Sequence, residues 1–180
     1  SAAEYWNRFR GPNGTGIADS TIKLRDLQKK DIIWKLDLPG KGHSSPVIWG
    51  GFLYLTCMNE DSSNFHVLSI HRETGNISWS REMAYQTFSK HDFNSFASPS
   101  ATVDKDRVYL SWATPKHYFV AALDHAGEWL WKKDLGPFKS QHGVGVSPVL
   151  YQDKLIIAND QLGQSFIVAL DKTSGSTIWK

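Results

Sequence analysis

The sequence predicts an all-β repeat protein built from four-stranded antiparallel units. The first observation is a glycine followed at a fixed offset by tryptophan, which occurs three times: Gly75–Trp79, Gly127–Trp131 and Gly175–Trp179. A local spacing that stays constant within a longer, slightly variable period indicates a repeat architecture. The second observation is that short β-forming runs without helical periodicity fill each repeat. Together they predict about 50 residues of antiparallel meander per repeat.

Each repeat presents its elements in the same order. A Ser-Pro pair opens each copy, at Ser45-Pro46, Ser98-Pro99 and Ser147-Pro148. A turn and two β-forming runs follow, and the tryptophan lies in a fourth run. The second and third runs cover 52–55 and 66–70 in the first copy, 108–110 and 119–123 in the second, and 155–157 and 166–170 in the third.

A four-stranded unit of this kind cannot bury both of its faces alone. Radial stacking of such units covers the faces and leaves only short edges, as in a β-propeller. In that arrangement each tryptophan is expected to lie on the outermost strand and to pack across the gap onto the next unit. The preceding glycine permits the tight turn into that strand.

The expected organisation is an arm, one orphan strand and three units, which we call blades. The arm covers 1–30 and the orphan outer strand 31–38, and the blades cover 39–82, 83–134 and 135–180. The orphan strand is expected because 31–36 matches the fourth run of a repeat, although no three runs precede it. Trp6 and Phe9 are expected to pin the arm to the ring.

Three blades are fewer than the 4–8 that closed propellers typically have. We therefore expect this chain to be part of a larger ring. Further blades of the same polypeptide, or self-association, would complete it.

The third repeat carries a more specific pattern, which runs Ala-Leu-Asp-Lys-Thr-Ser-Gly-Ser-Thr-Ile-Trp over 169–179. It resembles the tryptophan-docking motif of PQQ-like (quinoprotein-type) β-propeller repeats. The second copy, with Asp124, is one residue shorter, and His71 replaces the aspartate in the first copy. The resemblance covers roughly 31–180 and implies a fold rather than a chemistry, because the motif only holds blades together. The segment 6–16 resembles the leader that precedes the first blade in secreted proteins of this type.

Composition excludes several classes of function. The net charge is +2 and no basic tract is present, which argues against nucleic-acid binding. No apolar run reaches membrane-spanning length. Cys57 is the only cysteine, so an intramolecular disulfide is impossible, and we expect a buried, inert thiol. The resemblance implies a periplasmic or secreted protein.

Candidate binding residues lie in the loops that lead from one blade to the next. In a propeller these loops surround one mouth of the central channel, where a protein partner or a small ligand would bind. The candidate residues are His43, His91, Asn94, Phe96 and His142. The alternative is that these histidines only bond backbone carbonyls, and their unequal offsets from the Ser-Pro pairs argue against a metal ring. No catalytic residues are predicted, and Asp104, Asp106 and Asp153 are expected to be solvated hairpin residues.

These observations favour a non-enzymatic propeller that binds a partner, as the resemblance to propellers of outer-membrane assembly implies. No cofactor is predicted for that function. The alternative is that the chain forms part of a quinoprotein dehydrogenase, which oxidises an alcohol or sugar with pyrroloquinoline quinone (PQQ) and calcium. The adjacent cysteine pair found in many such enzymes is absent from this chain. Glycan binding by Phe93, Phe96 and Phe138 ranks last, because phenylalanine has no polar group for sugar hydroxyls.

Overall fold

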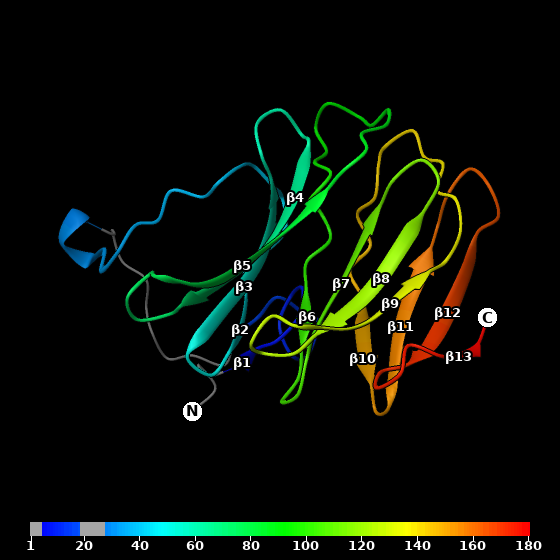
Figure 1. The fold of residues 1–180 in the computed structure, drawn as a ribbon. Coiled ribbons are helices and arrows are strands. Elements are labelled where there is room, and N and C mark those ends of the chain that lie inside the picture. Colours follow the sequence, from blue (N-terminus) through cyan, green and yellow to red (C-terminus); the bar gives the residue numbers. More distant parts are fainter. Residues whose placement is uncertain (1–4, 19–27) are drawn as a thin grey trace.

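The computed structural model describes residues 5–18 and 28–180, and nearly all regular structure there is β-strand (Figure 1). The strands form three antiparallel sheets in sequence order, so the all-β prediction is confirmed. Blade 1 contains β2 (Val47–Trp49), β3 (Phe52–Met58), β4 (Asn64–His71) and β5 (Ile77–Ala84). Blade 2 contains β6 (Thr102–Val103), β7 (Val108–Ala113), β8 (Tyr118–Leu123) and β9 (Trp129–Asp134). Blade 3 contains β10 (Val149–Tyr151), β11 (Lys154–Asn159), β12 (Phe166–Asp171) and β13 (Thr177–Trp179).

In blade 2, which has a neighbouring blade on each side, the middle strands are buried on both faces, whereas the outermost strand is not. Every residue of β7 is buried, and its sequence is continuously apolar apart from one serine. In β9 the half-buried residues alternate with exposed ones. This difference follows from stacking, because neighbouring blades cover both faces of the inner strands. Loops between blades lie at the upper end of the sheets in Figure 1, and the tight turns β10–β11 and β12–β13 lie at the lower end.

Three apolar clusters join the three blades, and one of the two between blades 1 and 2 includes Val47, Tyr54 and Val108. The other cluster between blades 1 and 2 includes Met58, Phe65, Val67, Leu110, Trp112 and Leu123. Blades 2 and 3 share a cluster that includes Tyr109, Tyr118, Val120, Leu155, Ile157 and Leu170. Because these side chains come from facing sheets, the blades cannot separate without exposing their cores to water.

A tryptophan side chain crosses each of the two gaps between blades. Trp79 of blade 1 donates from Nε1 to the backbone oxygen of His125 in blade 2, at 2.8 Å. Trp131 of blade 2 donates in the same way to the backbone oxygen of Lys172 in blade 3, at 3.1 Å. Each indole stands against a glycine of the receiving turn. A Cβ atom on that glycine would lie 2.7 Å from the ring, for both Gly127 and Gly175.

The receiving turns are held by an aspartate where the repeat supplies one. Asp171 Oδ1 accepts bonds from the backbone nitrogens of Thr173 and Ser174, at 3.0 and 2.7 Å. In the shorter second copy, Asp124 Oδ1 accepts from Ala126 and Glu128 instead. In these two copies the aspartate side chain therefore closes the turn that contains the glycine, and the tryptophan follows that turn at the same spacing in the sequence.

The expected orphan strand over 31–38 differs from the structure. A short 3-10 helix, η2 (Lys29–Asp31), ends at the first residue of this segment, and the residues after it form no sheet. The physical reason is that a strand requires a ladder partner, and the described residues offer none here. Trp34 nevertheless reaches blade 1, where it donates to the backbone oxygen of Arg72 at 2.8 Å and stands against Gly75.

The N-terminal arm takes part in blade 1 rather than lying wholly outside the repeats. Its strand β1 (Tyr5–Trp6) pairs with β2 and makes the first sheet five-stranded. Asn7 continues the arm to blade 2, where its backbone oxygen accepts from the nitrogen of Val103 at 2.8 Å. Trp6 packs against Gly11, whereas Phe9, expected to pin the arm, is 50% exposed. The remainder of the predicted arm, 1–4 and 19–27, lies outside the described residues.

The described blades do not close into a ring, and the outer face of blade 3 is open. Ile167, Ile178 and Trp179 are exposed there. The counterparts of Ile167 and Trp179 in blade 2, Val120 and Trp131, belong instead to the apolar cluster shared with blade 3, whereas Leu130, the counterpart of Ile178, is exposed. None of the helical structure in the described ranges is long and apolar enough to span a bilayer.

Candidate functional site

The three candidate histidines lie on the loops that lead into each blade. These loops are at the upper end of the sheets in Figure 1, and we call this region the upper mouth. All three histidines are exposed. The histidine in the loop before blade 1 is tied to the next loop, because the backbone nitrogens of His43 and Ser44 both donate to the oxygen of Ala97, at 3.0 and 2.9 Å. The loops before blades 1 and 2 therefore form one continuous surface.

His91 and His142 lie next to each other across the boundary between blades 2 and 3. Their ring centroids are 5.7 Å apart. His91 Nδ1 accepts a bond from the backbone nitrogen of Phe93 at 3.2 Å, which places the proton of the neutral ring on Nε2. In this state neither nitrogen of His91 offers a free lone pair to a metal.

Asn94 is the residue that joins these two loops. Its Nδ2 donates to the backbone oxygen of His142 at 2.6 Å and to that of Val144 at 3.3 Å. Its Oδ1 accepts from the backbone nitrogen of Ser95 at 2.8 Å and from the hydroxyl of Ser98. All the bonding capacity of the Asn94 amide is thus used within the protein, so this residue positions the mouth rather than binding a ligand directly.

Phe96 is a core residue in the structure, which differs from its expected role at the mouth. It is 8% exposed and packs against Tyr85 and Phe88. Phe138 is equally buried, at 5%. Of the three rings considered as sugar platforms, only Phe93 is exposed. Phe96 and Phe138 are buried because the loops that carry them also cover the upper end of the apolar core between the blades.

A cavity of about 550 Å³ opens between the loops of blades 1 and 2. Charged side chains of both signs line it, namely Lys41, Lys90, Glu60 and Asp92, and His43 lies among them. A larger cavity of about 930 Å³ lies between blades 2 and 3, where apolar residues such as Phe88, Leu162 and Phe166 line it. The first of these cavities is bordered by four of the five candidate residues or their immediate neighbours, so it is the candidate binding site.

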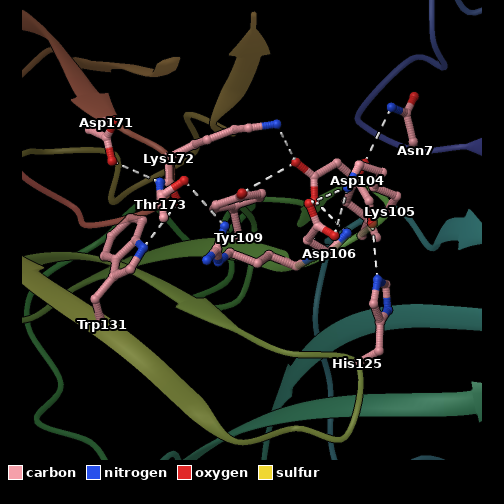
Figure 2. Close-up of polar contacts among 12 residues, drawn as sticks. Asn7, Asp104, Lys105, Asp106, Tyr109, His125, Trp131, Asp171, Lys172 and Thr173 are labelled. Carbon is pink, nitrogen blue, oxygen red and sulfur yellow. Dashed lines mark hydrogen bonds and ion pairs between the residues drawn. The ribbon is translucent and has the colours of Figure 1, made fainter. Parts of the chain in front are cut away.

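A buried polar network lies at the opposite end of the blades (Figure 2). Asp104 accepts from Lys172 Nζ at 2.8 Å, from Tyr109 at 3.3 Å, and from the backbone nitrogens of Asp106 and Arg107. Its side chain is only 14% exposed, so the expectation of a solvated hairpin residue is wrong for Asp104. Burial alone would raise its pKa, but Lys172 and the backbone donors together lower the pKa below its usual value.

His125 links blades 1 and 2 beside this network. Its Nε2 faces the backbone oxygen of Asp104 at 3.0 Å, and its Nδ1 faces the hydroxyl of Tyr54 at 2.8 Å. The carbonyl acceptor requires a proton on Nε2, so Nδ1 of the neutral ring accepts from Tyr54. Sequence reasoning missed these residues because Asp104 and Lys172 are 68 positions apart. The only available signal was that both lie in turns at the same end of their blades.

Comparisons with solved structures identify the class of fold. The chain is similar to a europium-containing methanol dehydrogenase, with a TM-score of 0.61 and 16% identity over 87% of this chain and 28% of that one. It is similar to the quinohemoprotein alcohol dehydrogenase ADHIIG from Pseudomonas putida HK5, with a TM-score of 0.56 and 20% identity over 81% and 21%. It also resembles BamB from Moraxella catarrhalis, with a TM-score of 0.51 and 13% identity over 80% and 53%.

These likenesses show that the chain has the fold of a PQQ-like β-propeller, as the sequence predicted. It spans about a quarter of each of the two dehydrogenases and about half of BamB. No family model matches the sequence, and no curated protein matches it.

The described residues contain no cluster of acidic, histidine or cysteine side chains of the size that a metal ion needs. Calcium takes six to eight oxygen ligands. Within the described ranges, no group of three or more His, Cys, Asp or Glu side chains could hold a metal ion. The Asn94 oxygen, a suitable ligand type, is already bonded to Ser95 and Ser98.

Proposed function

We propose that this chain belongs to a non-enzymatic propeller that binds a protein partner or small ligand at its upper mouth, in a periplasmic or secreted location. The observation that carries the proposal is the bonding between mouth loops of different blades. His43, Ser44 and Asn94 each bond a neighbouring loop, so the surface is ordered before any partner arrives. A preordered surface loses less conformational entropy on binding. The resemblance to propellers of outer-membrane assembly supports the same function.

The charges around the mouth cavity give a direct test. Lys41→Glu and Lys90→Glu reverse charges that line it, and Lys105→Glu reverses an exposed charge at the opposite end of blade 2. We expect the two mouth variants to weaken partner binding, measured by surface plasmon resonance with partners identified by crosslinking at position 43, while the control binds normally. Equal effects of all three variants, or catalytic turnover without any partner, would contradict the proposal.

The second candidate function is that the chain forms part of a quinoprotein dehydrogenase. The likeness to the methanol and alcohol dehydrogenases favours this candidate. Under that proposal, most of the calcium and PQQ ligands come from residues other than those described. Titration of the complete propeller, including the blades that would supply those ligands, with PQQ and calcium, followed by absorbance and thermal unfolding, tests it. A spectral shift together with a raised melting temperature would support this candidate. The absence of both changes would rule it out.

A further inference from the structure

The cavity of about 930 Å³ between blades 2 and 3 opens onto the edge of the apolar core that joins these blades. Phe88, Leu135 and Phe166 are half-buried, and each packs against the cluster shared by blades 2 and 3 while also lining the cavity. The volume lies within the range of about 300–1,000 Å³ that is typical of small-molecule sites. The floor of this cavity is therefore apolar surface that a ligand can reach.

The repeat explains why packing is incomplete at this boundary. In blade 2, Trp112 pairs across the strands with Phe119 and packs onto Phe65 of blade 1, with ring centroids 6.0 Å apart. The equivalent pair in blade 3 is Asn159 and Phe166. Because asparagine is much smaller than tryptophan, the gap between blades 2 and 3 lacks the indole that helps to fill the equivalent gap between blades 1 and 2.

The charged residues among those that line the cavity are both lysines, Lys139 and Lys180. Lys180 Nζ lies 3.7 Å from the centre of the Phe166 ring, which places its ammonium group at the cavity wall. Lys132 makes the same kind of contact with Phe119 in blade 2, at 4.8 Å. The position of the Lys180 ammonium therefore follows from the repeat.

The carboxylates closest in sequence to the cavity wall bond other groups. Asp134 and Asp160 each precede a lining residue, but neither of them lines the cavity. Asp134 Oδ2 bonds His117 Nδ1 at 2.6 Å, and Asp160 Oδ1 accepts from the hydroxyl of Ser165 at 3.4 Å. The cavity thus combines apolar surface with positive charge.

Hydrogen bonds hold the two sides of the cavity together. Gln161 accepts from the backbone nitrogen of Lys139 at 2.9 Å and donates to the backbone oxygen of Pro137 at 3.1 Å. The backbone nitrogen of Leu162 donates to the oxygen of Lys139 at 2.8 Å, and the side chain of Leu162 remains 60% exposed at the cavity. The cavity is therefore preformed, and apolar contact has to supply most of the affinity for a ligand.

We propose that this cavity binds a medium-length aliphatic carboxylate, with its chain on Leu135 and Leu162 and its carboxylate beside Lys180. Burial of the chain favours binding, and a charge-assisted hydrogen bond to the ammonium selects an anionic head group. An aromatic acid fits less well, because Lys180 already lies over the ring of Phe166. This inference goes beyond the proposed binding at the upper mouth, since it concerns a separate cavity.

The test is isothermal titration of the 180-residue protein with octanoate, decanoate and dodecanoate below their micellar concentrations. We expect a single site per chain, with an affinity that rises about 3- to 4-fold for each added methylene group. Decyltrimethylammonium carries the same chain as a comparison with a positive head group, and it should not bind. Acetate and phenylacetate should not bind either.

Two variants with matched controls locate the site. Lys180→Gln should weaken decanoate binding by about 2- to 5-fold, as expected for an exposed charge pair. Lys132→Gln is its control, because Lys132 has the same position in blade 2 and does not line this cavity. Leu162→Ser should weaken binding by about 3- to 10-fold. Its control is Ile17→Ser, which removes a similarly exposed aliphatic side chain from the arm.

All four substituted side chains are exposed, so the melting temperature of the ligand-free protein should not change. Four results would overturn the proposal: decanoate does not bind, the affinity is independent of chain length, decyltrimethylammonium binds as tightly as decanoate, or Lys132→Gln weakens binding as much as Lys180→Gln. Partner binding at the mouth, measured with the Lys41 and Lys90 variants, would stand under each of these results.

Discussion

At the scale of single residues, three glycines determine how closely each tryptophan approaches the next blade. Gly75, Gly127 and Gly175 have φ values of 73°, 84° and 72°, a region that other residues enter at a cost of about 1–2 kcal/mol. Each also faces an indole at a distance that leaves no room for a methyl group. Two independent constraints therefore require glycine at the same position of the repeat.

Gly127→Ala should lower the free energy of unfolding by about 2–4 kcal/mol, because it adds left-handed strain and displaces Trp79. Gly145→Ala is the control, since no atom lies within 4 Å of a Cβ built there. Urea unfolding followed by tryptophan fluorescence measures both variants. Equal stabilities for the two variants would show that the close approach of Trp79 to Gly127 has no energetic importance.

The ion pair between Asp104 and Lys172 predicts a pH dependence. The folded-state pKa of Asp104 lies below its unfolded value of about 3.9. Its ionised form thus stabilises the fold above that value, and this contribution is lost as the pH falls through the lower folded-state pKa. Lys172→Met should reduce the free energy of unfolding by about 1–3 kcal/mol at neutral pH and flatten its decline in acid.

The control for this experiment is Lys105→Met, which removes an exposed pair with Asp106. Exposed pairs contribute little, so this variant should match the unmodified protein. If Lys172→Met kept the original acid dependence, Asp104 would not be the group responsible.

At the scale of elements, the loops at the upper mouth are ordered mainly by contacts with one another. The loop over 138–146 has no strand of its own, yet Asn94 and Gln161 hold it from two sides. Its order therefore depends on side chains from other elements, and loss of one such side chain should free the loop without unfolding the sheets.

Asn94→Ala should speed amide exchange in residues 138–146 by about tenfold, since two hydrogen bonds to that loop are lost. Exchange in β7, β8, β11 and β12 should remain unchanged. Asn13→Ala serves as control, because the Asn13 side chain bonds Thr15 within the arm. Faster exchange throughout blade 3 would mean that Asn94 supports the whole blade and not the loop alone.

The sequence allowed prediction of elements whose shape depends on nearby residues. The strands and the turns around Gly127 and Gly175 were predictable because the aspartate, glycine and tryptophan of each turn lie within a few positions. The segment 31–38 was predicted as a strand from its pattern, but a strand also needs a partner. Phe96 was assigned to the mouth by its position in a loop, whereas its burial depends on packing across two blades. The contact of Asp104 with Lys172 depends in the same way on distant residues.

At the scale of the whole molecule, one type of joint is repeated at each boundary between blades. Trp34, Trp79 and Trp131 each donate to a backbone oxygen of the next turn and cover its glycine. Trp179 occupies the same position on blade 3 but is 44% exposed, and no blade in the described residues receives it. The account's central claim is that the indole stabilises the fold only where a neighbouring blade receives it.

The most direct measurement is the free energy of urea unfolding of Trp131→Ala and Trp179→Ala in the 180-residue protein. Both variants remove the same side chain from equivalent positions of the repeat, and only Trp131 has a receiving blade. We predict a loss of about 3 kcal/mol for Trp131→Ala and of less than about 1 kcal/mol for Trp179→Ala. Equal losses, or a larger loss for Trp179→Ala, would contradict the role of these tryptophans as joints between blades.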